Sequence, residues 1–423
     1  MVQNRPYWLD TAPRPELALE AELPKRADVA VIGGGYTGVA AARSLAKAGI
    51  DVTVLERATL GGGASTRNGG FVLPGFKRPA AELVKRLGFG PARDLHEASI
   101  AAVRYVAEFV AKEAPDCDYQ PSGHLILAAK PAHYTALARE HEVLARAFHH
   151  QTEMIPPERL HKEELIANAY HGALLDPLGG GINPAKLFWA LAASARKAGA
   201  KFVEQVEVVR VRRSAGVVML QTSKGDLMAR DVIVATNGYT GAAVPALRRR
   251  VVPVGSYVIA TAPLGPSVAR QLLPRNRVVS DTRNLLSYFR IAPDTRMVFG
   301  GRVSFGKVQG YDGAKTLSDT LCGLFPRLLG TDIDYYWSGL VGMTWDQLPH
   351  AGVHHGLHYA LGYNGHGVAL ATYLGARVGQ SLAGGDDLRP FGERALRAVP
   401  LYFGRPWFLP LVGAYYKLKD KLR

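Results

Sequence analysis

Two short apolar segments near the start of the chain enclose a segment rich in small aliphatic residues. Residues 28–32 and 51–56 are compact, mainly apolar runs, and each predicts a buried β-strand. Residues 39–48 between them carry mostly alanine, leucine and valine, which predicts an α-helix. The order strand, helix, strand is the βαβ unit of a nucleotide-binding fold.

The pattern along the rest of the chain predicts two kinds of sheet. Residues 79–151 are largely helical, interrupted at 119–128 by a strand that enters a second domain. A helix is expected at 185–198, with Pro184 near its first turn. The chain returns to the first sheet through strands at 201–208 and 231–236, and through a last strand and helix within 357–383. Strands of an open antiparallel sheet are predicted at 251–262, 287–291 and 297–301.

The turn after the first strand carries three glycines in the spacing Gly-x-Gly-x-x-Gly. Gly33 permits a tight turn, Gly35 lets a pyrophosphate approach the backbone, and Gly38 lets the helix lie close to the strand. The helix N-terminus then presents N–H groups to the phosphates. Glu56, about 20 residues farther on, is placed to bind an adenosine ribose. The pattern predicts a dinucleotide site, with a glycine-rich structural turn as the alternative.

The segment after the second strand distinguishes FAD from NAD. Residues 60–70 are small or hydrogen-bonding, where an NAD domain usually continues into another helix. Gly69 and Gly70 would let the backbone approach a flavin ring. Ser65, Thr66 and Asn68 offer hydrogen bonds to phosphate or ring edges. This composition favours FAD, with a solvated loop as the alternative.

Two distant segments support a flavin. Residues 235–238 (Ala-Thr-Asn-Gly) follow a short apolar strand that would deliver a loop to the cofactor. Residues 359–367 form a strand and a glycine-rich loop that opens a helix. The dipole of that helix would stabilise negative charge on the reduced ring. An ordinary strand–helix turn is the alternative for the second segment.

Motifs spread over nearly the whole chain resemble one family. They are Tyr7-Trp8, residues 31–38, 62–70 and 235–238, Tyr288-Phe-Arg290 with Gly300-Gly-Arg302, and residues 362–367. The chain resembles the D-amino-acid oxidase-like superfamily of FAD-dependent oxidoreductases, and most of all its gamma-glutamylputrescine oxidase-type amine oxidase branch. The cofactor motifs of this resemblance are specific, whereas its substrate motifs are not.

The element pattern and the resemblance together imply a fold that is α/β and α+β. A discontinuous Rossmann-like FAD-binding domain is expected at 1–80, 150–250 and 335–388. A substrate domain built on an antiparallel sheet is inserted at 81–149 and 251–334, and residues 389–423 form a C-terminal tail.

The predicted cofactor residues come from three distant parts of the chain. They are Gly33, Gly35, Tyr36, Thr37, Gly38, Glu56, Arg57, Ser65, Thr66, Asn68, Gly69, Gly70, Val208, Ala235, Thr236, Asn237, Gly238, Tyr363, Asn364, Gly365, His366, Gly367 and Val368. Some relatives tether flavin through His or Cys, but residues 60–78 contain neither. Noncovalent FAD is therefore expected. The histidines show no metal-binding spacing, so no metal is expected.

The resemblance implies oxidation of a primary or secondary amine or an amino acid. Hydride passes from the substrate carbon to the flavin, the resulting imine hydrolyses, and O₂ is the expected electron acceptor. Arg290 or Arg302 would clamp a substrate carboxylate, with a structural salt bridge as the alternative. Tyr257 would face the flavin, and His366 would tune it or only pack its loop. Tyr363 and Trp345 would form an aromatic cage for the amine, or pack in the core.

The composition of the chain indicates how many domains it can form and in which cellular compartment it would act. The 423 residues suffice for two domains, and the two cysteines, Cys117 and Cys322, form no redox motif, which suits a reducing cytoplasm. No signal peptide or membrane-spanning run is visible, so a cytoplasmic location is expected. The net charge of +15 is scattered, apart from Arg248–Arg250 and the tail at 417–423.

Several alternatives stay open at this stage. The tail, with aromatic residues beside lysines, would either pack as a terminal helix or make a weak contact with a membrane surface. Alternative functions are a flavin dehydrogenase that passes electrons to a quinone or carrier protein, a tRNA-associated protein, and a noncatalytic flavoprotein. No nucleic-acid partner is expected, because the basic residues do not form a basic–aromatic surface.

Overall fold

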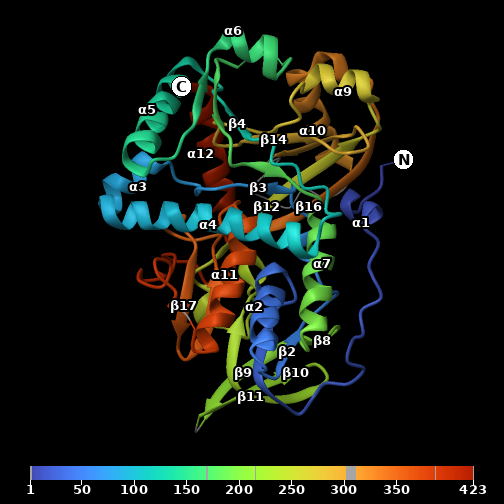
Figure 1. Ribbon diagram of the computed structural model, residues 1–423, viewed down its shortest axis with the longest axis vertical. Helices are drawn as coiled ribbons and strands as arrows, with labels where there is room; N and C mark the ends of the chain where they lie inside the picture. The colour runs from blue at the N-terminus through green and yellow to red at the C-terminus, as the bar shows by residue number, and fades with distance from the viewer. Residues whose placement is uncertain (1, 168–169, 215, 302–310, 386, 423) are drawn as a thin grey trace.

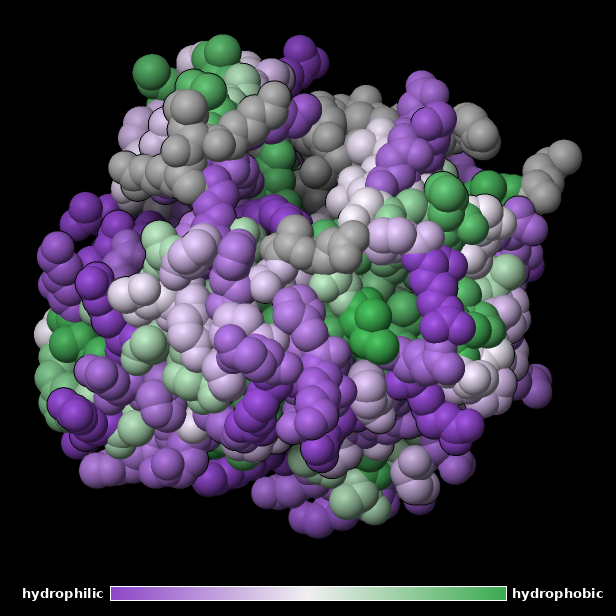
Figure 2. All heavy atoms as spheres, turned by 90° about the horizontal axis from the view of Figure 1, so that it is seen from above, coloured by the Kyte–Doolittle hydropathy of each residue, from purple (hydrophilic) through white to green (hydrophobic). Residues whose placement is uncertain are grey.

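The computed structural model describes residues 2–167, 170–214, 216–301, 311–385 and 387–422. Two large sheets organise these residues, the first in the lower part of Figure 1 and the second in the upper part. The long helix α4 (Phe89–Glu113) lies across the middle of the view, between them. Hydrophilic residues dominate the end of the molecule seen in Figure 2, with apolar residues in smaller patches between them.

The first sheet has the strand order β17, β18, β11, β1, β2, β8. Its parallel strands are β1 (Arg26–Ile32), β2 (Val52–Leu55), β8 (Lys201–Val203), β11 (Gly225–Val234) and β18 (Leu357–Leu361). Three antiparallel strands extend it, namely β17 (His350–His354), β10 (Val217–Thr222) and β9 (Val208–Ser214). Every residue of β2 is buried, as expected for a parallel strand covered on both faces. The predicted βαβ unit and its parallel sheet are thus confirmed.

Three helices lie side by side over one face of this sheet: α2 (Tyr36–Lys47), α7 (Pro184–Lys197) and α11 (Gly367–Leu382) (Figure 1). Helix α7 begins where the sequence predicts, because Asn183 Oδ1 accepts hydrogen bonds from the N–H groups of Ala185 (3.1 Å) and Lys186 (3.2 Å). Pro184 occupies the first helical position, where its missing N–H has no cost.

The second sheet has the order β16, β12, β15, β14, β13, β4, β6, β5. Its strands are β4 (His124–Leu127), β5 (Glu153–Ile155), β6 (Ala173–Asp176), β12 (Val252–Thr261), β13 (Val278–Asp281), β14 (Ser287–Ile291), β15 (Met297–Gly301) and β16 (Ile333–Met343). Neighbours are antiparallel except β13 and β4, which run parallel. The predicted strands at 287–291 and 297–301 coincide with β14 and β15.

Two stretches pair differently from the expected domain boundaries. Residues 153–176 supply β5 and β6, and residues 333–343 supply β16, all in the second sheet. The expected boundaries at 150 and 335 placed nearly all of these residues with the cofactor domain. The local pattern predicts a strand but not its partner, because pairing depends on segments far away in the sequence.

The remaining elements connect and cover the two sheets. The helices are α1 (Tyr7–Thr11), α3 (Ala80–Leu87), α5 (Pro131–Phe148), α6 (Pro157–Arg159), α8 (Pro245–Arg248), α9 (Pro266–Leu272), α10 (Tyr311–Leu324) and α12 (Leu409–Leu422). The shorter turns are η1 (Ala64–Thr66), η2 (Leu160–Glu164), η3 (Asn237–Tyr239) and η4 (Pro326–Leu328), and β3 (Phe71–Val72) pairs with β7 (Gly180–Gly181). Among the residues described, no helix is both long and apolar enough to cross a bilayer.

Candidate functional site

A cavity of about 790 Å³ extends from the first sheet to the second. At one end it is lined by Gly33 and Glu56, which follow β1 and β2. At the other end it is lined by Ser256 of β12 and Tyr288 of β14. The carboxyl ends of parallel strands are the usual ligand-binding edge of such a sheet.

The three glycines after β1 are closely packed, with a backbone oxygen beside Gly33 and Gly38 and a side-chain hydroxyl beside Gly35. Gly33 has φ +106°, and a Cβ there would lie 2.9 Å from the carbonyl oxygen of Ala235. A Cβ on Gly35 would lie 2.9 Å from Ser65 Oγ, which accepts a hydrogen bond from the N–H of Tyr36. A Cβ on Gly38 would lie only 2.0 Å from the carbonyl oxygen of Gly33, so α2 contacts the turn backbone directly. The glycines therefore leave an open backbone surface at the N-terminus of α2, as a pyrophosphate requires.

Glu56 closes this end of the cavity. Its carboxylate accepts hydrogen bonds from the N–H groups of Gly34 (2.8 Å) and Ala58 (2.9 Å). The side chain is thereby held at the end of β2, beside the glycine turn and on the cavity wall. A carboxylate oriented in this way can accept hydrogen bonds from the hydroxyl groups of a ribose.

The loop at 60–70 is shaped by its own polar side chains. Asn68 Nδ2 donates to the carbonyl oxygens of Ala64 (3.1 Å) and Ser65 (2.9 Å), and Asn68 Oδ1 accepts from the N–H of Gly70 (2.8 Å). Thr66 donates its hydroxyl proton to the Gly61 carbonyl at 2.9 Å. These bonds fix the backbone of the loop, whose residues 62–65 and 67–69 line the cavity.

Two tryptophans from distant parts of the chain hold the same loop. Trp8 Nε1 donates to the carbonyl oxygen of Asn68 at 2.8 Å, and Trp337 Nε1 donates to that of Arg67 at 2.9 Å. Sequence reasoning placed Trp8 among the family motifs but missed Trp337. No local signal marks Trp337, because its role depends on the position of β16 against the loop.

The turn before α11 forms the third wall of the cofactor end. The hydroxyl groups of Tyr363 and Thr37 share a hydrogen bond of 2.7 Å, which joins this turn to α2. Asn237 Oδ1 accepts from the N–H of Gly362 at 2.9 Å and joins it to the loop after β11. Helix α11 packs directly on α2, because a Cβ on Gly375 would lie 2.2 Å from the Thr37 carbonyl oxygen.

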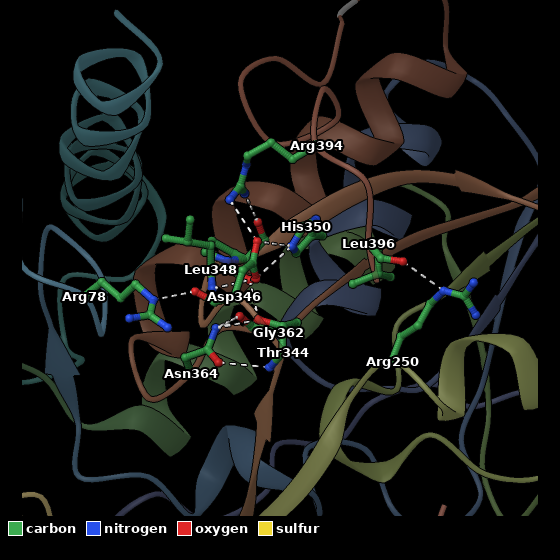
Figure 3. A network of polar contacts seen from close by, with 11 residues as sticks. Arg78, Arg250, Thr344, Asp346, Leu348, His350, Gly362, Asn364, Arg394 and Leu396 are labelled. Atoms are coloured by element: carbon green, nitrogen blue, oxygen red, sulfur yellow. Dashed lines mark hydrogen bonds and ion pairs between the residues drawn. The ribbon is translucent and has the colours of Figure 1, made fainter. Parts of the chain in front are cut away.

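A polar network lies behind this turn (Figure 3). Asn364 Oδ1 accepts from the N–H of Thr344 at 3.1 Å, and the Asp346 carboxylate contacts His350 Nε2 at 3.0 Å and Arg394 Nη1 at 3.3 Å. Burial alone would raise the pKa of Asp346, but the hydrogen bond from His350 and the charge of Arg394 hold it below its ordinary value. Arg78 Nε donates to the Asp346 carbonyl at 2.7 Å, so the network also fixes the segment before α3.

The far end of the cavity is formed by polar and aromatic side chains of the second sheet. Ser256 Oγ lies 3.1 Å from Tyr288 Oη, and His124 Nε2 lies 2.8 Å from Ser280 Oγ. The Phe71 ring packs edge-on against Tyr288 and His124, with centroid distances of 5.8 and 6.4 Å. Tyr288 also reaches the first sheet's loop, since a Cβ on Gly69 would lie 2.8 Å from its ring.

Two histidines in this region are uncharged at neutral pH. Burial lowers the pKa of His124 to about 4. Burial, together with the nearby His124 and Lys77, lowers the pKa of His366 to about 3. The buried Nδ1 of His366 has no hydrogen-bond partner among the described residues. An imidazole in this state offers a polar atom to a bound molecule without adding positive charge.

A third set of polar residues was missed by sequence reasoning, and two of its members, His96 and Asp176, line the same cavity. His96 Nε2 lies 2.8 Å from His150 Nδ1, and His150 Nε2 lies 3.0 Å from Asp176 Oδ1. Burial lowers the pKa of His96 to about 4. These residues are far apart in the sequence, and no motif joins them. The neighbouring wall is apolar and includes Leu137 and Leu144.

Comparison with known proteins identifies the family to which this chain belongs. Residues 28–380 match the family described as FAD dependent oxidoreductase, DAO. The chain belongs to this family of FAD-dependent oxidoreductases. It is 36% identical to gamma-glutamylputrescine oxidoreductase of Escherichia coli over 93% of both chains, and 32% identical to a probable oxidoreductase, OrdL, of Haemophilus influenzae over 94% of this chain and 93% of that one. Glycine oxidase of Geobacillus kaustophilus has a similar structure, with a TM-score of 0.73 and 25% identity over 88% of this chain and 99% of that chain. The resemblance inferred from the sequence is confirmed.

The residues present fit FAD. Most predicted cofactor residues line the cavity, from Gly33 and Glu56 after the first two strands to His366 in the turn before α11. Four of them lie behind its wall, namely Gly38, Thr66, Gly70 and Gly238. They shape the loops by close packing and internal hydrogen bonds. The glycine turn and Glu56 would hold the ADP part, and the turn before α11 would lie at the flavin part.

The structure corrects the placement of Tyr257. Its ring stacks on Tyr336, with centroids 6.3 Å apart, in the core on the other side of the second sheet. Ser256, the neighbouring residue on β12, lines the cavity instead. Because successive side chains of a strand point to opposite faces, an error of one residue moves the prediction to the wrong face.

The substrate role expected for Arg290 is not supported by its surroundings. Arg290 is buried outside the cavity wall, and Arg290 Nη1 donates to the carbonyl oxygens of Gly70 (3.0 Å) and Ile182 (2.8 Å). Burial lowers its pKa to about 10. Arg302, the other candidate clamp, lies outside the described residues. Trp345 is more than half exposed and does not line the cavity, so it forms no cage with Tyr363.

Proposed function

We propose that this FAD-dependent oxidoreductase oxidises the carbon beside a primary or secondary amine or amino group. The observation that carries the proposal is the continuity of the cavity from the dinucleotide-binding loops to a pocket of neutral histidines and aromatic rings. Bound FAD would supply the hydride acceptor, and water would then hydrolyse the imine product to a carbonyl compound and an amine or ammonia. The similarity to gamma-glutamylputrescine oxidoreductase of E. coli supports an amine substrate.

The charges of the pocket suit an amine that reacts in its neutral form. Hydride can leave the α-carbon only when the nitrogen lone pair is free to form the imine. Neutral His124 and His366 would accept hydrogen bonds from the amine N–H groups. Phe71 and Tyr288 would exclude water around the reacting carbon, and the apolar wall near Leu137 would take up a hydrocarbon substituent.

The test is anaerobic bleaching of the bound flavin by a panel of candidate substrates. The panel contains polyamines, gamma-glutamylated amines, N-methyl amino acids and D-amino acids. We expect at least one amine to bleach the absorbance band of the flavin when about one mole of amine has been added per mole of bound flavin. If no member does so while dithionite does, the amine proposal is wrong and a noncatalytic flavoprotein is favoured.

The electron acceptor is proposed to be O₂. A substrate that bleaches the flavin should then consume O₂ and release H₂O₂ in equal amounts. Slow reoxidation in air with rapid reoxidation by a quinone analogue would instead favour the dehydrogenase alternative. Retention of tRNA by the FAD-loaded protein at moderate salt would favour the nucleic-acid alternative.

We also propose that FAD is bound noncovalently. Cys117 and Cys322, both in the described part of the chain, do not line the cavity, and residues 60–78 contain no His or Cys. Acid precipitation should leave the yellow colour in the supernatant. A yellow pellet would show a covalent link, and peptide mapping would then be directed first at the cavity histidines.

A further inference from the structure

The segment at 401–418 exposes an unusual number of large apolar side chains. Six of them are more than half exposed, namely Leu401, Phe403, Trp407, Leu411, Tyr415 and Leu418. Residues 401 and 407 lie next to each other, because Trp407 Nε1 donates to the carbonyl of Leu401 at 3.1 Å. Exposed apolar residues occur singly on most protein surfaces, but a contiguous group marks an interaction site.

Helix α12 places half of this group on one side. At about 100° per residue, Leu411, Tyr415 and Leu418 fall on one face of the helix. Leu409 and Asp420 fall on the opposite face. Leu409 is buried with Val252 and Val254 of β12 in a small core cluster.

Asp420 fixes which face of α12 points outward. Its carboxylate accepts hydrogen bonds from the N–H of Asn284 (3.0 Å), the side-chain amide of Asn284 (2.6 Å) and the N–H of Leu285 (3.0 Å). Lys130 Nζ donates to the Asp420 carbonyl at 2.8 Å. The helix is thus anchored near both ends, and its apolar face is directed to solvent by the fold. Helix α12 is therefore a packed terminal helix that also exposes an apolar face.

The tertiary structure also brings the basic cluster Arg248–Arg250 against the first part of this segment. Arg248 Nη2 donates to the carbonyl of Gly404 at 3.3 Å, and the guanidinium of Arg249 lies over the Phe403 ring at 4.7 Å. Arg405 and Lys417 are exposed on the same segment. Cations therefore border the exposed aromatic and aliphatic side chains, although Arg249 and Phe403 are more than 150 residues apart.

We propose that this basic and apolar surface docks on an anionic membrane surface. Tyr and Leu side chains on one side of a fixed helix, with Trp407 just before it, can enter the headgroup region while flanking Lys and Arg side chains bind acidic lipids. A second copy of the chain is a poorer fit, because the border of the surface is basic and two such borders would repel each other. The proposal does not depend on the substrate or on the electron acceptor.

The test is sedimentation of the FAD-loaded protein with lipid vesicles. Vesicles of phosphatidylcholine alone are compared with vesicles that also contain phosphatidylglycerol, at low and physiological salt. We expect binding to the anionic vesicles, decreasing with salt. The triple variant W407S/L411S/L418S should bind at least tenfold more weakly, and R249Q/K417Q should lose about fivefold for each cation removed.

Control variants separate this surface from general stickiness. Leu329→Ser removes an apolar side chain that is 81% exposed elsewhere on the molecule, and it should leave vesicle binding unchanged. The melting temperature and flavin spectrum verify that each variant is folded. The proposal is overturned if the intact protein does not bind anionic vesicles, or if the two surface variants bind as well as it does. A dimer in solution that W407S/L411S/L418S converts to a monomer would also overturn it, because a second copy would then cover the surface.

Discussion

Gly38 shows how a single residue determines the cofactor end of the cavity. A Cβ at this position would lie 2.0 Å from a backbone oxygen, which cannot rotate away as a side chain could. We expect Gly38→Ala to push α2 from the turn and to reduce stability by about 1–3 kcal/mol. The purified variant should lose most of its FAD, measured as the ratio of flavin to protein absorbance.

Gly323→Ala is the matched control for this substitution. Gly323 is an exposed helical residue of α10 with no atom near its missing side chain. Alanine is the better helix former, so this variant should be as stable as the parent or slightly more stable. Full FAD content in Gly38→Ala would contradict the close packing of α2 on the turn.

The buried histidines make the stability of the protein depend on pH. The pKa is lowered to about 4 for His96 and His124 and to about 3 for His366, whereas an unfolded histidine has a pKa near 6.5. Below pH 6.5 the unfolded chain therefore binds protons that the folded chain does not bind. The free energy of unfolding should decrease as the pH falls from about 6.5 towards 4.

Thermal denaturation across pH 4–8 measures this dependence. His124→Gln should reduce the slope below pH 6.5, because it removes one of these three groups. A melting temperature that stays constant from pH 7 to 4.5 would show that these histidines are not buried in their neutral form.

At the scale of elements, Arg290 joins the second sheet to the loops around the first. It extends from β14 to the carbonyl oxygens of Gly70 and Ile182, beside β3 and β7. Arg290→Met would leave the buried carbonyl of Ile182 without the donor that Arg290 provides, at a cost of about 1–3 kcal/mol. The Gly70 carbonyl would keep the hydrogen bond that it accepts from the N–H of Ile182 at 2.8 Å. We expect a lower melting temperature and weaker FAD binding.

Steady-state kinetics distinguish this positioning role from a substrate clamp. The residual activity of Arg290→Met should fall similarly for substrates with and without a carboxylate. A KM that rises only for carboxylate-bearing substrates would restore Arg290 as the clamp. Met at the exposed Arg270 serves as the control.

At the scale of the whole molecule, the cavity joins segments that have no contact along the chain. The turn after β1, the loop at 60–70, the turn before α11 and the second sheet all line it. A ligand that contacts all of them stabilises the folded state by about 2.7 kcal/mol when its concentration is a hundred times its Kd. Removal of FAD should therefore lower the melting temperature by several degrees.

Reconstitution identifies the part of the ligand that each end binds. FAD should restore the melting temperature, whereas FMN, which lacks the ADP part, should restore much less of it. Equal stabilisation by FMN would contradict the assignment of Glu56 and the glycine turn to the ADP part.

Features that depend on neighbouring residues were predicted correctly from the sequence, whereas features that depend on distant segments were not. The strands at 287–291 and 297–301 and the helix start at Pro184 were correct, because strand pattern and helix capping are local. Tyr257 was placed on the wrong face of its strand, since the face of a strand depends on distant segments. The same holds for residues 153–176, whose strands join the second sheet. The clamp role of Arg290 stays a prediction, and the backbone carbonyls that it contacts support the structural alternative.

The sequence by itself determined the dinucleotide site and the family. A tight glycine turn, a helix N-terminus and an acidic strand end follow one another within about 30 residues, so local geometry alone predicts such a site. Tertiary structure decided which side chains face the substrate end, because sheet register sets Ser256 inward and Tyr257 outward. It also decided that Arg249 and Phe403 share one surface, since only chain packing brings such distant residues together.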